Sequence, residues 1–395
     1  LKHKIDMKFL SNEEFETRQA KLQNLIKENG FDALLISSNA NIYYATGMVF
    51  AGYVYVPAEG TSVFLIRRPV GIDDCRAKYI RKPEQILEIL SEMGLPAPAK
   101  LAMEADRAAF STIQRLAKAL NQTEIINGSP ILSKARSVKT EYEIKLLKES
   151  GVRHTNSYKR IYGKYENGMT DVELQIEIER ILRLDGCLGI FRINGESMEL
   201  FMGNLLAGDN ADTPTPYDFA MGGEGLDNSL PVGCNGTVIR PGNTIMVDMN
   251  GNFTGYMTDM TRTFYVERVS DLAKKAHQLS IDINHKLMET MKPGTKACEA
   301  YMTAQAMVEE AGLTDYFMGH NQKAGFVGHG VGIEVNEMPV IAPKSRDILE
   351  LGNVIALEPK FVIPGVGAVG VENTYIVREN GLECITTFPE ELTQI

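Results

Sequence analysis

The sequence predicts two domains, a small α/β domain followed by a larger α+β domain, and three observations support this prediction. The chain has 395 residues, more than one ordinary domain needs. Its first third alternates helical and strand-like apolar patterns, whereas strand-rich segments separated by amphipathic helices make up the rest. A short motif that begins at Gly242 also returns at Gly352, which indicates a repeat inside the second domain.

The first domain is predicted from capping signals and short apolar runs. Ser11 and Glu14 have the spacing of a capping box and Gly30 is a typical helix end, so a helix is expected from about 12 to 29. The other expected elements are strands at 33–36, 62–66 and 101–103 and helices at 83–90 and 107–120. This alternation is typical of a small α/β domain with one sheet.

We expect the chain to divide into domains 1–135 and 136–395. The periodic pattern breaks around 131–139, and Thr140 with Glu143 then forms a second capping box that opens a helix through Leu147. Three further amphipathic helices are expected, one through Leu174, Ile178, Ile181 and Leu182, one at about 270–291 and one at about 295–311.

The composition excludes several classes of protein. With 51 acidic and 41 basic residues the formal net charge is −10, which argues against a general nucleic-acid binder or a polybasic membrane-surface protein. The five cysteines are scattered without a CxxC pair, which argues against a disulfide framework. No apolar run approaches the roughly 18 to 20 residues of a membrane-spanning helix. We therefore expect a cytoplasmic protein with no nucleic-acid or membrane partner.

Four acidic residues follow the strands of the internal repeat. The runs 242–248 and 352–358 both begin with Gly-Asn and end on a carboxylate at the same spacing. Each run leads into a turn-rich stretch and a second strand with another acid. The four acids are Asp248, Asp259, Glu358 and Glu372. Two such strand pairs facing one another would gather the four carboxylates at one centre.

Turn chemistry predicts the register of each strand pair, because opposite residues of an antiparallel pair have a constant sum of sequence numbers. Glu358 faces Glu372 if the turn centres on residue 365, and Pro364-Gly365 has the composition of a type II turn.

For the first strand pair we expect Asp248 to face Asp259, which requires a turn centred between Phe253 and Thr254. The alternative hairpin at Asn250-Gly251 would separate the two aspartates by several residues, and we reject it.

Carboxylates that converge in a sheet interior would repel one another unless a cation compensates them. Four carboxylates neutralise two divalent ions, and an oxygen-rich set with one imidazole suits manganese, iron, cobalt or zinc in a two-metal site. His329 is the candidate imidazole among six histidines, because its small neighbours in the segment 328–332 allow a metal to approach closely.

These motifs resemble those of a known family. The segment 242–266, with Gly255-Tyr256 and Thr258-Asp259-Met-Thr-Arg262-Thr-Phe264, resembles the first acidic motif of the pita-bread metallopeptidases. The remaining ligand motifs are matched by 328–339, Leu357-Glu358-Pro359 and Gly370-Val371-Glu372, and Arg136-Ser-Val-Lys139 resembles the entry to the catalytic domain. Over nearly its full length the chain looks like the two-domain branch that contains aminopeptidase P, prolidase and creatinase.

The resemblance implies a creatinase-like N-terminal α/β domain and an α+β pita-bread catalytic domain with an internal pseudo-twofold repeat. It implies two divalent metal ions, manganese first and zinc, cobalt or iron as alternatives. Their ligands would be Asp248, Asp259, His329, Glu358 and Glu372. Relatives of this branch are often dimers or tetramers, so a homodimer is expected by analogy.

The resemblance has two departures on the substrate side. Family peptidases have a histidine where Val232 stands here, and another where Asn336 stands. These imidazoles contact the scissile group or the developing oxyanion, and losing one such donor typically costs about 100- to 1,000-fold in rate. Asn336 is either a redesigned substrate contact or simple drift, and Val232 cannot donate a hydrogen bond. His320 either replaces a lost imidazole or is an exposed helix-end histidine.

The leading hypothesis is a metal-dependent hydrolase of Xaa-Pro type, either a dipeptidase or an aminopeptidase. A hydroxide bridging two ions would attack the peptide carbonyl, because metal binding lowers the pKa of water towards neutrality. Glu358 would pass a proton to the leaving amine. Arg262 would orient the nearby ligand carboxylate, with a surface ion pair as the alternative interpretation.

Two other functions compete with this hypothesis. The same scaffold can act on a non-peptide small molecule, by hydrolysis or lyase chemistry, because a site around Val232 and Asn336 is more apolar and less suited to a peptide oxyanion. A binding protein that has lost catalysis is the third class. Such proteins usually lose their ligands, whereas all five are retained here.

Overall fold

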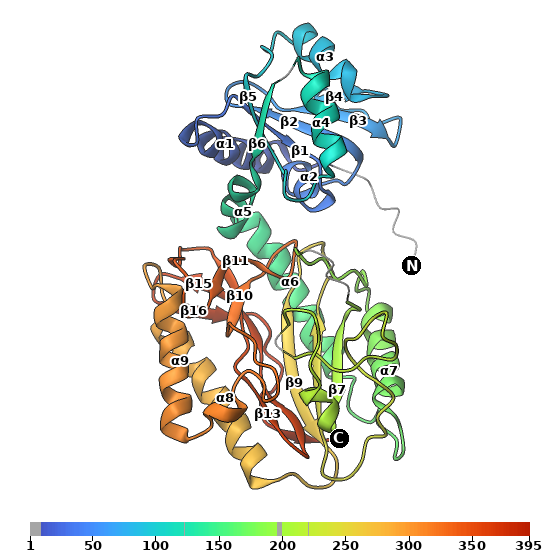
Figure 1. Ribbon diagram of the computed structural model, residues 1–395, viewed down its shortest axis with the longest axis vertical. Helices are drawn as coiled ribbons and strands as arrows, with labels where there is room; N and C mark the ends of the chain where they lie inside the picture. The colour runs from blue at the N-terminus through green and yellow to red at the C-terminus, as the bar shows by residue number, and fades with distance from the viewer. Residues whose placement is uncertain (1–8, 122, 196–199, 220) are drawn as a thin grey trace. The chain divides into compact units, whose positions relative to one another are not determined.

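The computed structural model describes residues 9–121, 123–195, 200–219 and 221–395. The chain divides into two compact units, Leu1–Arg136 and Ser137–Ile395 (Figure 1). This division lies one residue beyond the boundary expected from the sequence. In the described part of the chain, no helix combines the length and the apolar character that crossing a membrane requires.

The first unit is built around a mixed sheet of six strands in the order β4-β3-β2-β1-β5-β6. The strands are β1 (Ala33–Ile36), β2 (Ala51–Pro57), β3 (Val63–Arg68), β4 (Ala77–Tyr79), β5 (Lys100–Met103) and β6 (Glu124–Asn127). The helices are α1 (Asn12–Glu28), α2 (Asn39–Thr46), η1 (Pro83–Gln85), α3 (Ile86–Glu92), α4 (Phe110–Ala119) and α5 (Ser129–Ser137). The central strand β1 is buried along its whole length, as its uninterrupted apolar run predicts.

The chain crosses between the two units in helical form, which differs from the sequence expectation. The broken pattern at 131–139 suggested an irregular segment, but α5 runs to Ser137. The capping box at Thr140 is present, since its side chain accepts from the backbone N–H of Glu143. It opens α6 (Glu141–Tyr158), which is longer than apolar periodicity indicated because its buried face includes polar side chains such as His154.

The second unit contains two larger sheets and a hairpin. The first sheet has the order β17-β9-β8-β7 and the second the order β11-β10-β12-β15-β16. Their strands are β7 (Gly203–Ala207), β8 (Thr244–Asn250), β9 (Asp259–Tyr265), β10 (Gly328–Gly330), β11 (Glu337–Ile341), β12 (Val354–Leu357), β15 (Asn373–Arg378), β16 (Gly381–Cys384) and β17 (Thr393–Gln394). The hairpin consists of β13 (Lys360–Ile363) and β14 (Gly367–Gly370).

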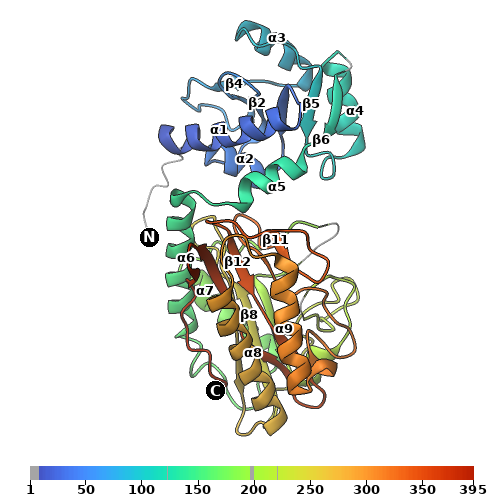
Figure 2. The same cartoon turned by 90° about the vertical axis from the view of Figure 1, so that its left-hand side faces the viewer.

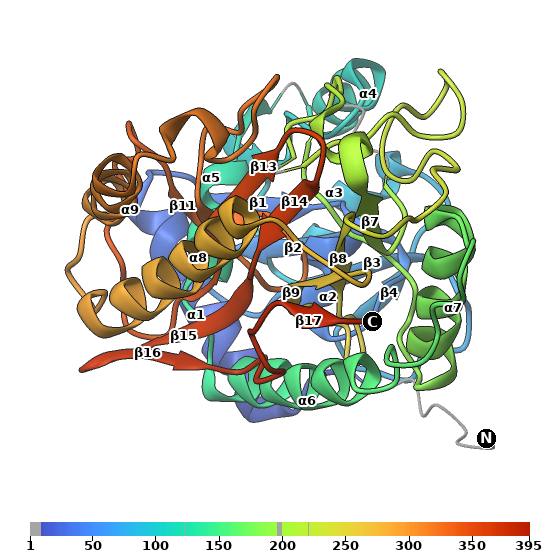
Figure 3. The ribbon, with the colours of Figure 1, turned by 90° about the horizontal axis from the view of Figure 1, so that it is seen from below.

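Helices cover the outer faces of these strands in two pairs. Apolar residues of α6 and α7 (Asp171–Leu184) share one core cluster with β7, β8 and β9. Those of α8 (Asp271–Thr290) and α9 (Ala297–Ala311) share another with β12, β13 and β15. Figure 2 shows α8 and α9 side by side, and Figure 3 shows α8 running beside the β13–β14 hairpin. Short helical turns η2 (Gly208–Asp212) and η3 (Thr314–Tyr316) complete the unit.

Backbone hydrogen bonds join the two halves at the residues that matter for the site. Thr261 in β9 and Glu372 exchange N–H···O bonds of 3.3 and 3.2 Å. The hydroxyl of Thr374 in β15 accepts from the backbone N–H of Asp259 and donates to its carbonyl, both at 2.8 Å. The backbone of Asp259 is therefore bonded to β15 of the second sheet, and the backbone of Glu372 is bonded to β9 of the first.

Candidate metal centre

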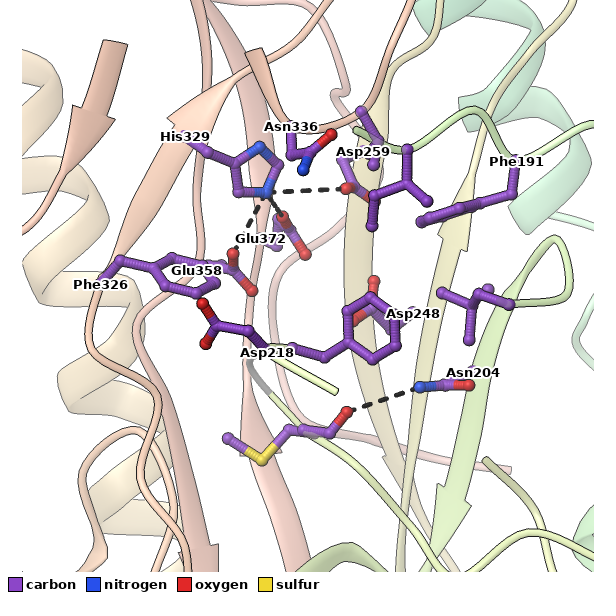
Figure 4. A pocket seen from close by; sticks show the side chains of 16 residues that line it. Phe191, Asn204, Asp218, Asp248, Asp259, Phe326, His329, Asn336, Glu358 and Glu372 are labelled. Carbon is purple, nitrogen blue, oxygen red and sulfur yellow. Dashed lines mark hydrogen bonds and ion pairs between the residues drawn. The ribbon is translucent and has the colours of Figure 1, made fainter. Parts of the chain in front are cut away.

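Five side chains from both halves of the second unit converge on one pocket (Figure 4). Asp248 lies in β8, Asp259 begins β9 and His329 lies in β10. Glu358 directly follows β12, and Glu372 directly precedes β15. The structure thus brings together all five residues that the sequence analysis selected as metal ligands.

The register expected for the second strand pair is confirmed. Lys360 pairs with Gly370 and Ile363 with Gly367, so the constant sum also places Glu358 opposite Glu372. The turn closes through a 3.0 Å bond from the Val366 N–H to the Ile363 carbonyl. Gly365 has φ +78°, which is the conformation that the third position of a type II turn requires.

The register expected for the first strand pair is wrong by two residues. Asp248 pairs with Thr261, and Asp259 pairs with Asn250, so the connection centres between Thr254 and Gly255. The side chain of Asn252 accepts a 3.1 Å bond from the Gly255 N–H and organises this loop, a local contact that composition did not reveal. The two aspartates remain on the same face as diagonal neighbours, because a shift of two residues preserves the face.

His329 is oriented towards the acids by its backbone neighbour. Its Nδ1 lies 3.1 Å from the carbonyl oxygen of Gly330, which makes Nδ1 the protonated nitrogen and leaves Nε2 facing the pocket. Nε2 is 3.2 Å from Glu358 Oε1 and 4.0 Å from oxygens of both Asp259 and Glu372. Ligand atoms of Asp259, His329 and Glu372 all lie within 4.8 Å of one another, which is the spacing of a metal-binding triad.

The electrostatics of the triad favour a cation. Burial, together with the charge of Asp248, raises the pKa of Asp259 to about 7. Burial and the neighbouring carboxylates raise the pKa of Glu372 well above its usual value. Within the described chain, the buried atom Glu372 Oε1 has no hydrogen-bond partner. A buried carboxylate oxygen in this situation fits a metal-coordinating role.

A buried lysine also belongs to the cluster, and sequence reasoning missed it. Lys360 Nζ lies 2.8 Å from Asp248 Oδ2, 2.7 Å from Glu358 Oε2 and 3.0 Å from Glu372 Oε2. Although burial alone would lower the pKa of Lys360, these carboxylates raise it well above the ordinary value. The strand period was the available signal, because residue 360 shares a strand face with Glu358 two positions earlier.

Glu358 is held in its ionised form by two neighbours. Burial would raise its pKa, but the ammonium of Lys360 and the hydrogen bond from His329 lower it to about 2. In turn, burial would lower the pKa of His329, but the hydrogen bond and charge of Glu358 and the charge of Asp259 raise it to about 9. Without a divalent ion, the positive charges of the His329 imidazolium and the Lys360 ammonium therefore compensate the negative charges of the carboxylates.

Arg262 does not orient a ligand side chain, contrary to the sequence expectation. It is three residues beyond Asp259 in β9 and so faces the opposite side of the sheet. Its guanidinium donates to the backbone carbonyl of Glu372 at 2.9 Å and to Asn373 Oδ1 at 2.8 Å. A further bond of 2.7 Å reaches the Pro389 carbonyl. Arg262 is thus a buried side chain that fixes the backbone of Glu372 and of the segment at Pro389.

The expected substrate contacts are placed differently. Asn336 lines the pocket, but its amide is paired with both backbone groups of Asn194, accepting from the N–H at 2.6 Å and donating to the carbonyl. Val232 is buried and lines a separate cavity beside Cys234. His320 lies outside the pocket lining, with Nδ1 2.9 Å from Asp212 Oδ2. Val232 therefore does not line the candidate site, contrary to expectation, and the exposed His320 agrees with the second of the two interpretations that its sequence allowed.

The rest of the pocket is mainly apolar. The whole pocket has a volume of about 560 Å³, including open solvent at its mouth. Aromatic and aliphatic side chains line it, namely Phe191, Ile193, Leu200, Phe219, Met221, Phe326 and Val335. The added polar groups are Asn204 and Asp218, both labelled in Figure 4. Many of these residues lie between α7 and β8, where the sequence has little periodicity, so no pattern predicted them.

Comparison with known families agrees with this geometry. Residues 145–379 match the metallopeptidase family M24, and residues 18–138 match the creatinase/prolidase N-terminal domain. The chain belongs to metallopeptidase family M24. The predicted two-domain pita-bread architecture is confirmed by the same matches and by solved structures that share the fold. One of these, an Xaa-Pro dipeptidase from Bacillus anthracis, superposes with a TM-score of 0.79 at 24% identity, covering 96% of this chain and 100% of that one.

Relatives of this M24 chain align over almost its whole length. An uncharacterized peptidase, YqhT of Bacillus subtilis, is 28% identical over 94% of this chain and 98% of its own. An Xaa-Pro dipeptidase of Pyrococcus horikoshii is 24% identical over 94% of this chain and 97% of its own. An X-Pro aminopeptidase from Thermotoga maritima shares the fold, with a TM-score of 0.78 at 21% identity over 95% of this chain and 99% of that one.

M24 enzymes are metal-dependent, and the residues of this centre fit a divalent ion. Asp259, His329 and the unpaired oxygen of Glu372 form a coherent ligand set. One oxygen of Asp248 and one oxygen of Glu358 accept hydrogen bonds from the Lys360 ammonium.

Proposed function

We propose that this protein is a metal-dependent hydrolase of Xaa-Pro type that cleaves dipeptides or the N-terminal bond of short peptides. Manganese is the proposed metal, held by Asp259, His329 and Glu372. The observation that carries the proposal is the convergence of these ligands with Glu358 in a small apolar pocket. Curated relatives that align over nearly the whole chain support it, because two of them are Xaa-Pro dipeptidases of Pyrococcus species.

The pocket offers a chemical role to each group around the scissile bond. A bound divalent ion would polarise the scissile carbonyl of the substrate and activate a water molecule. Glu358 is ionised and adjoins His329 at 3.2 Å, so its carboxylate accepts a proton from the attacking water and delivers it to the leaving nitrogen. Phe191, Phe219 and Phe326 enclose an apolar residue such as the proline ring and exclude bulk water.

A comparison of matched peptides tests this function. Manganese-loaded protein is assayed with Ala-Pro, with an Ala-Pro-containing tripeptide, and with Ala-Ala as the matched substrate that lacks the ring. We expect hydrolysis of the proline substrates, and loss of that hydrolysis in Asp259→Asn. Absence of hydrolysis across a set of Xaa-Pro dipeptides and longer peptides, by protein that demonstrably holds metal, would overturn the proposal.

A second candidate is hydrolysis or cleavage of a non-peptide small molecule by the same centre. One observation favours it: among the described residues that line the pocket, His329 is the only imidazole. One N–H and the oxygen of the Asn336 amide are already engaged by Asn194, so a peptide oxyanion finds at most one amide N–H there and no imidazole. Native mass spectrometry of the purified protein separates the candidates, because a retained proline-containing peptide contradicts this one and a retained non-peptide metabolite supports it.

A further inference from the structure

We propose that the ammonium of Lys360 is a built-in cation that takes the place of one divalent ion, so that the centre holds a single exchangeable metal at Asp259, His329 and Glu372. This inference rests on the proposed function for the identity of the ligands. Its subject is the number of ions rather than the substrate, so the two proposals can fail separately.

The ammonium of Lys360 is surrounded by carboxylates of the centre. An ammonium has three N–H donors, and here all three find carboxylate oxygens, from Asp248, Glu358 and Glu372, at 2.7 to 3.0 Å. These are the distances of charge-assisted hydrogen bonds. The side chain of Lys360 is fully buried. Three of the four acids expected to neutralise metal are therefore already neutralised in part by the chain itself.

The backbone prevents Lys360 from leaving the centre easily. It opens β13, pairs with Gly370 in β14, and its carbonyl accepts a 2.8 Å bond from the N–H of Met318. Moving the ammonium into solvent would leave the carboxylates of Asp248, Glu358 and Glu372 without this donor. Its position is therefore built into the fold.

The two oxygens of Glu372 have different surroundings, which divides the centre into two halves. Oε2 accepts from Lys360 at 3.0 Å and from the hydroxyl of Thr261 at 2.7 Å. Oε1 has no hydrogen-bond partner in the described chain and lies 4.0 Å from His329 Nε2. One half is thus saturated by an ammonium, whereas the other half presents the triad that suits an ion.

A second divalent ion would have to share oxygens with the ammonium. An ion bonded to Asp248 or Glu358 would lie about 2.1 Å from a carboxylate oxygen. Nζ lies 2.7 to 2.8 Å from one oxygen of each of these carboxylates, so an ion bonded to either of those oxygens would be within roughly 5 Å of the ammonium in a buried site. Like charges at that separation repel strongly, and we expect the second ion to be excluded.

Metal counting on the full chain tests the inference. Wild-type protein, Lys360→Ala and the control Lys139→Met are incubated with manganese, freed of excess by gel filtration and analysed by elemental mass spectrometry. Lys139 is a matched control, because it is also buried and paired with a carboxylate, Glu337 at 3.0 Å. We expect one ion per chain in the wild type and the control, and one more in Lys360→Ala. Equal counts in wild type and a folded Lys360→Ala, or two ions in the wild type, would overturn the inference.

A second measurement uses only the wild-type protein, so it gives a result even if Lys360→Ala fails to fold. Electron paramagnetic resonance of the manganese-loaded protein should give the six-line signal of an isolated ion, whereas the signal of an exchange-coupled pair contradicts the inference. Failure of the proposed function looks different. One ion without Xaa-Pro hydrolysis refutes the function alone, and Xaa-Pro hydrolysis by a two-ion centre refutes this inference alone.

Discussion

At the scale of single residues, Glu372 lies between the Lys360 ammonium and the metal-binding triad. One of its carboxylate oxygens binds Lys360 and Thr261, and the other faces His329. Its backbone is fixed by Thr261 on one side and by the Arg262 guanidinium on the other. The side chain is therefore held in a single position, which is what a metal ligand needs if the site is to be formed before the ion arrives.

Replacing Glu372 with glutamine tests this role directly. Glu372→Gln removes the charge and offers an amide to the triad, so the affinity for manganese should fall by more than about 100-fold, the loss seen even when outer-shell partners of a metal are removed. Isothermal titration calorimetry measures the affinity. The exposed Glu379→Gln serves as a control, and equal affinities of the two variants would refute the assignment.

Asn336 also acts at this scale, through the segment that it holds. Its amide pairs with the backbone of Asn194, near the pocket residues Phe191 and Ile193. Asn336→Ala should loosen this wall at a cost of about 1 kcal/mol. We therefore expect KM to rise by about 5-fold while kcat changes little. A kcat loss of 100-fold or more would instead assign Asn336 to the transition state.

Asn321→Ala is the matched control for this variant. Its side chain makes comparable contacts with Asp212, at 2.9 Å to Oδ2, and it does not line the pocket. Its KM should equal that of the wild type. A similar rise in both variants would show that the effect of Asn336→Ala is not specific to the pocket wall.

At the scale of elements, the β13–β14 hairpin determines where Lys360 and the two glutamates lie. Its type II turn depends on Gly365 at φ +78°, and an added Cβ there would meet no atom within 4 Å. The expected cost of Gly365→Ala is therefore conformational rather than steric, about 1 kcal/mol. Denaturant unfolding should show this loss.

A second glycine substitution separates backbone strain from the general effect of replacing glycine. Gly325 also has no atom within 4 Å of an added Cβ, and its φ lies outside the left-handed range. Gly325→Ala should leave the free energy of unfolding unchanged or slightly raised, because alanine restricts the unfolded chain. Equal destabilisation by both substitutions would contradict the turn assignment.

At the scale of the whole molecule, two buried histidines link stability to pH. Burial lowers the pKa of His154 to about 3 and that of His277 to about 4. An unfolded histidine titrates near 6.5, so below that pH the unfolded chain binds protons that the folded chain does not. The contribution of these two histidines to the free energy of unfolding should therefore fall as pH decreases from 6.5 towards 4, by up to about 1.4 kcal/mol per pH unit for each histidine.

Urea unfolding between pH 7 and pH 4.5 measures this slope. His277→Gln keeps a donor for the Glu390 carbonyl, which lies 2.7 Å from His277 Nε2, but removes one titrating group. The slope should therefore decrease by up to about 1.4 kcal/mol per pH unit in this variant. An unchanged slope would show that His277 takes up its proton in the folded state.

Features of this protein that depend on residues close together in the chain could be predicted from the sequence. The N-cap at Ser11, the capping box at Thr140 and the Pro364-Gly365 turn are local, and each appears where the sequence predicts it. The same holds for the gathering of the four acids and His329, because two strand ends with turn-fixed register leave little freedom in where their side chains point.

The sequence by itself determined the two-domain architecture, the repeated acids and the identity of the converging side chains, because these depend on periodicity, turn residues and spacing along the chain. Tertiary structure decided the rest. It shifted the Asp248–Asp259 register through a side-chain contact of Asn252, turned Arg262 behind the sheet, and buried Val232 in another cavity. It also placed the Lys360 ammonium between carboxylates of both halves. The contacts of Arg262 with Glu372 and of Lys360 with Asp248 join residues more than 100 positions apart, and only the packing of the two sheets brings these residues within reach.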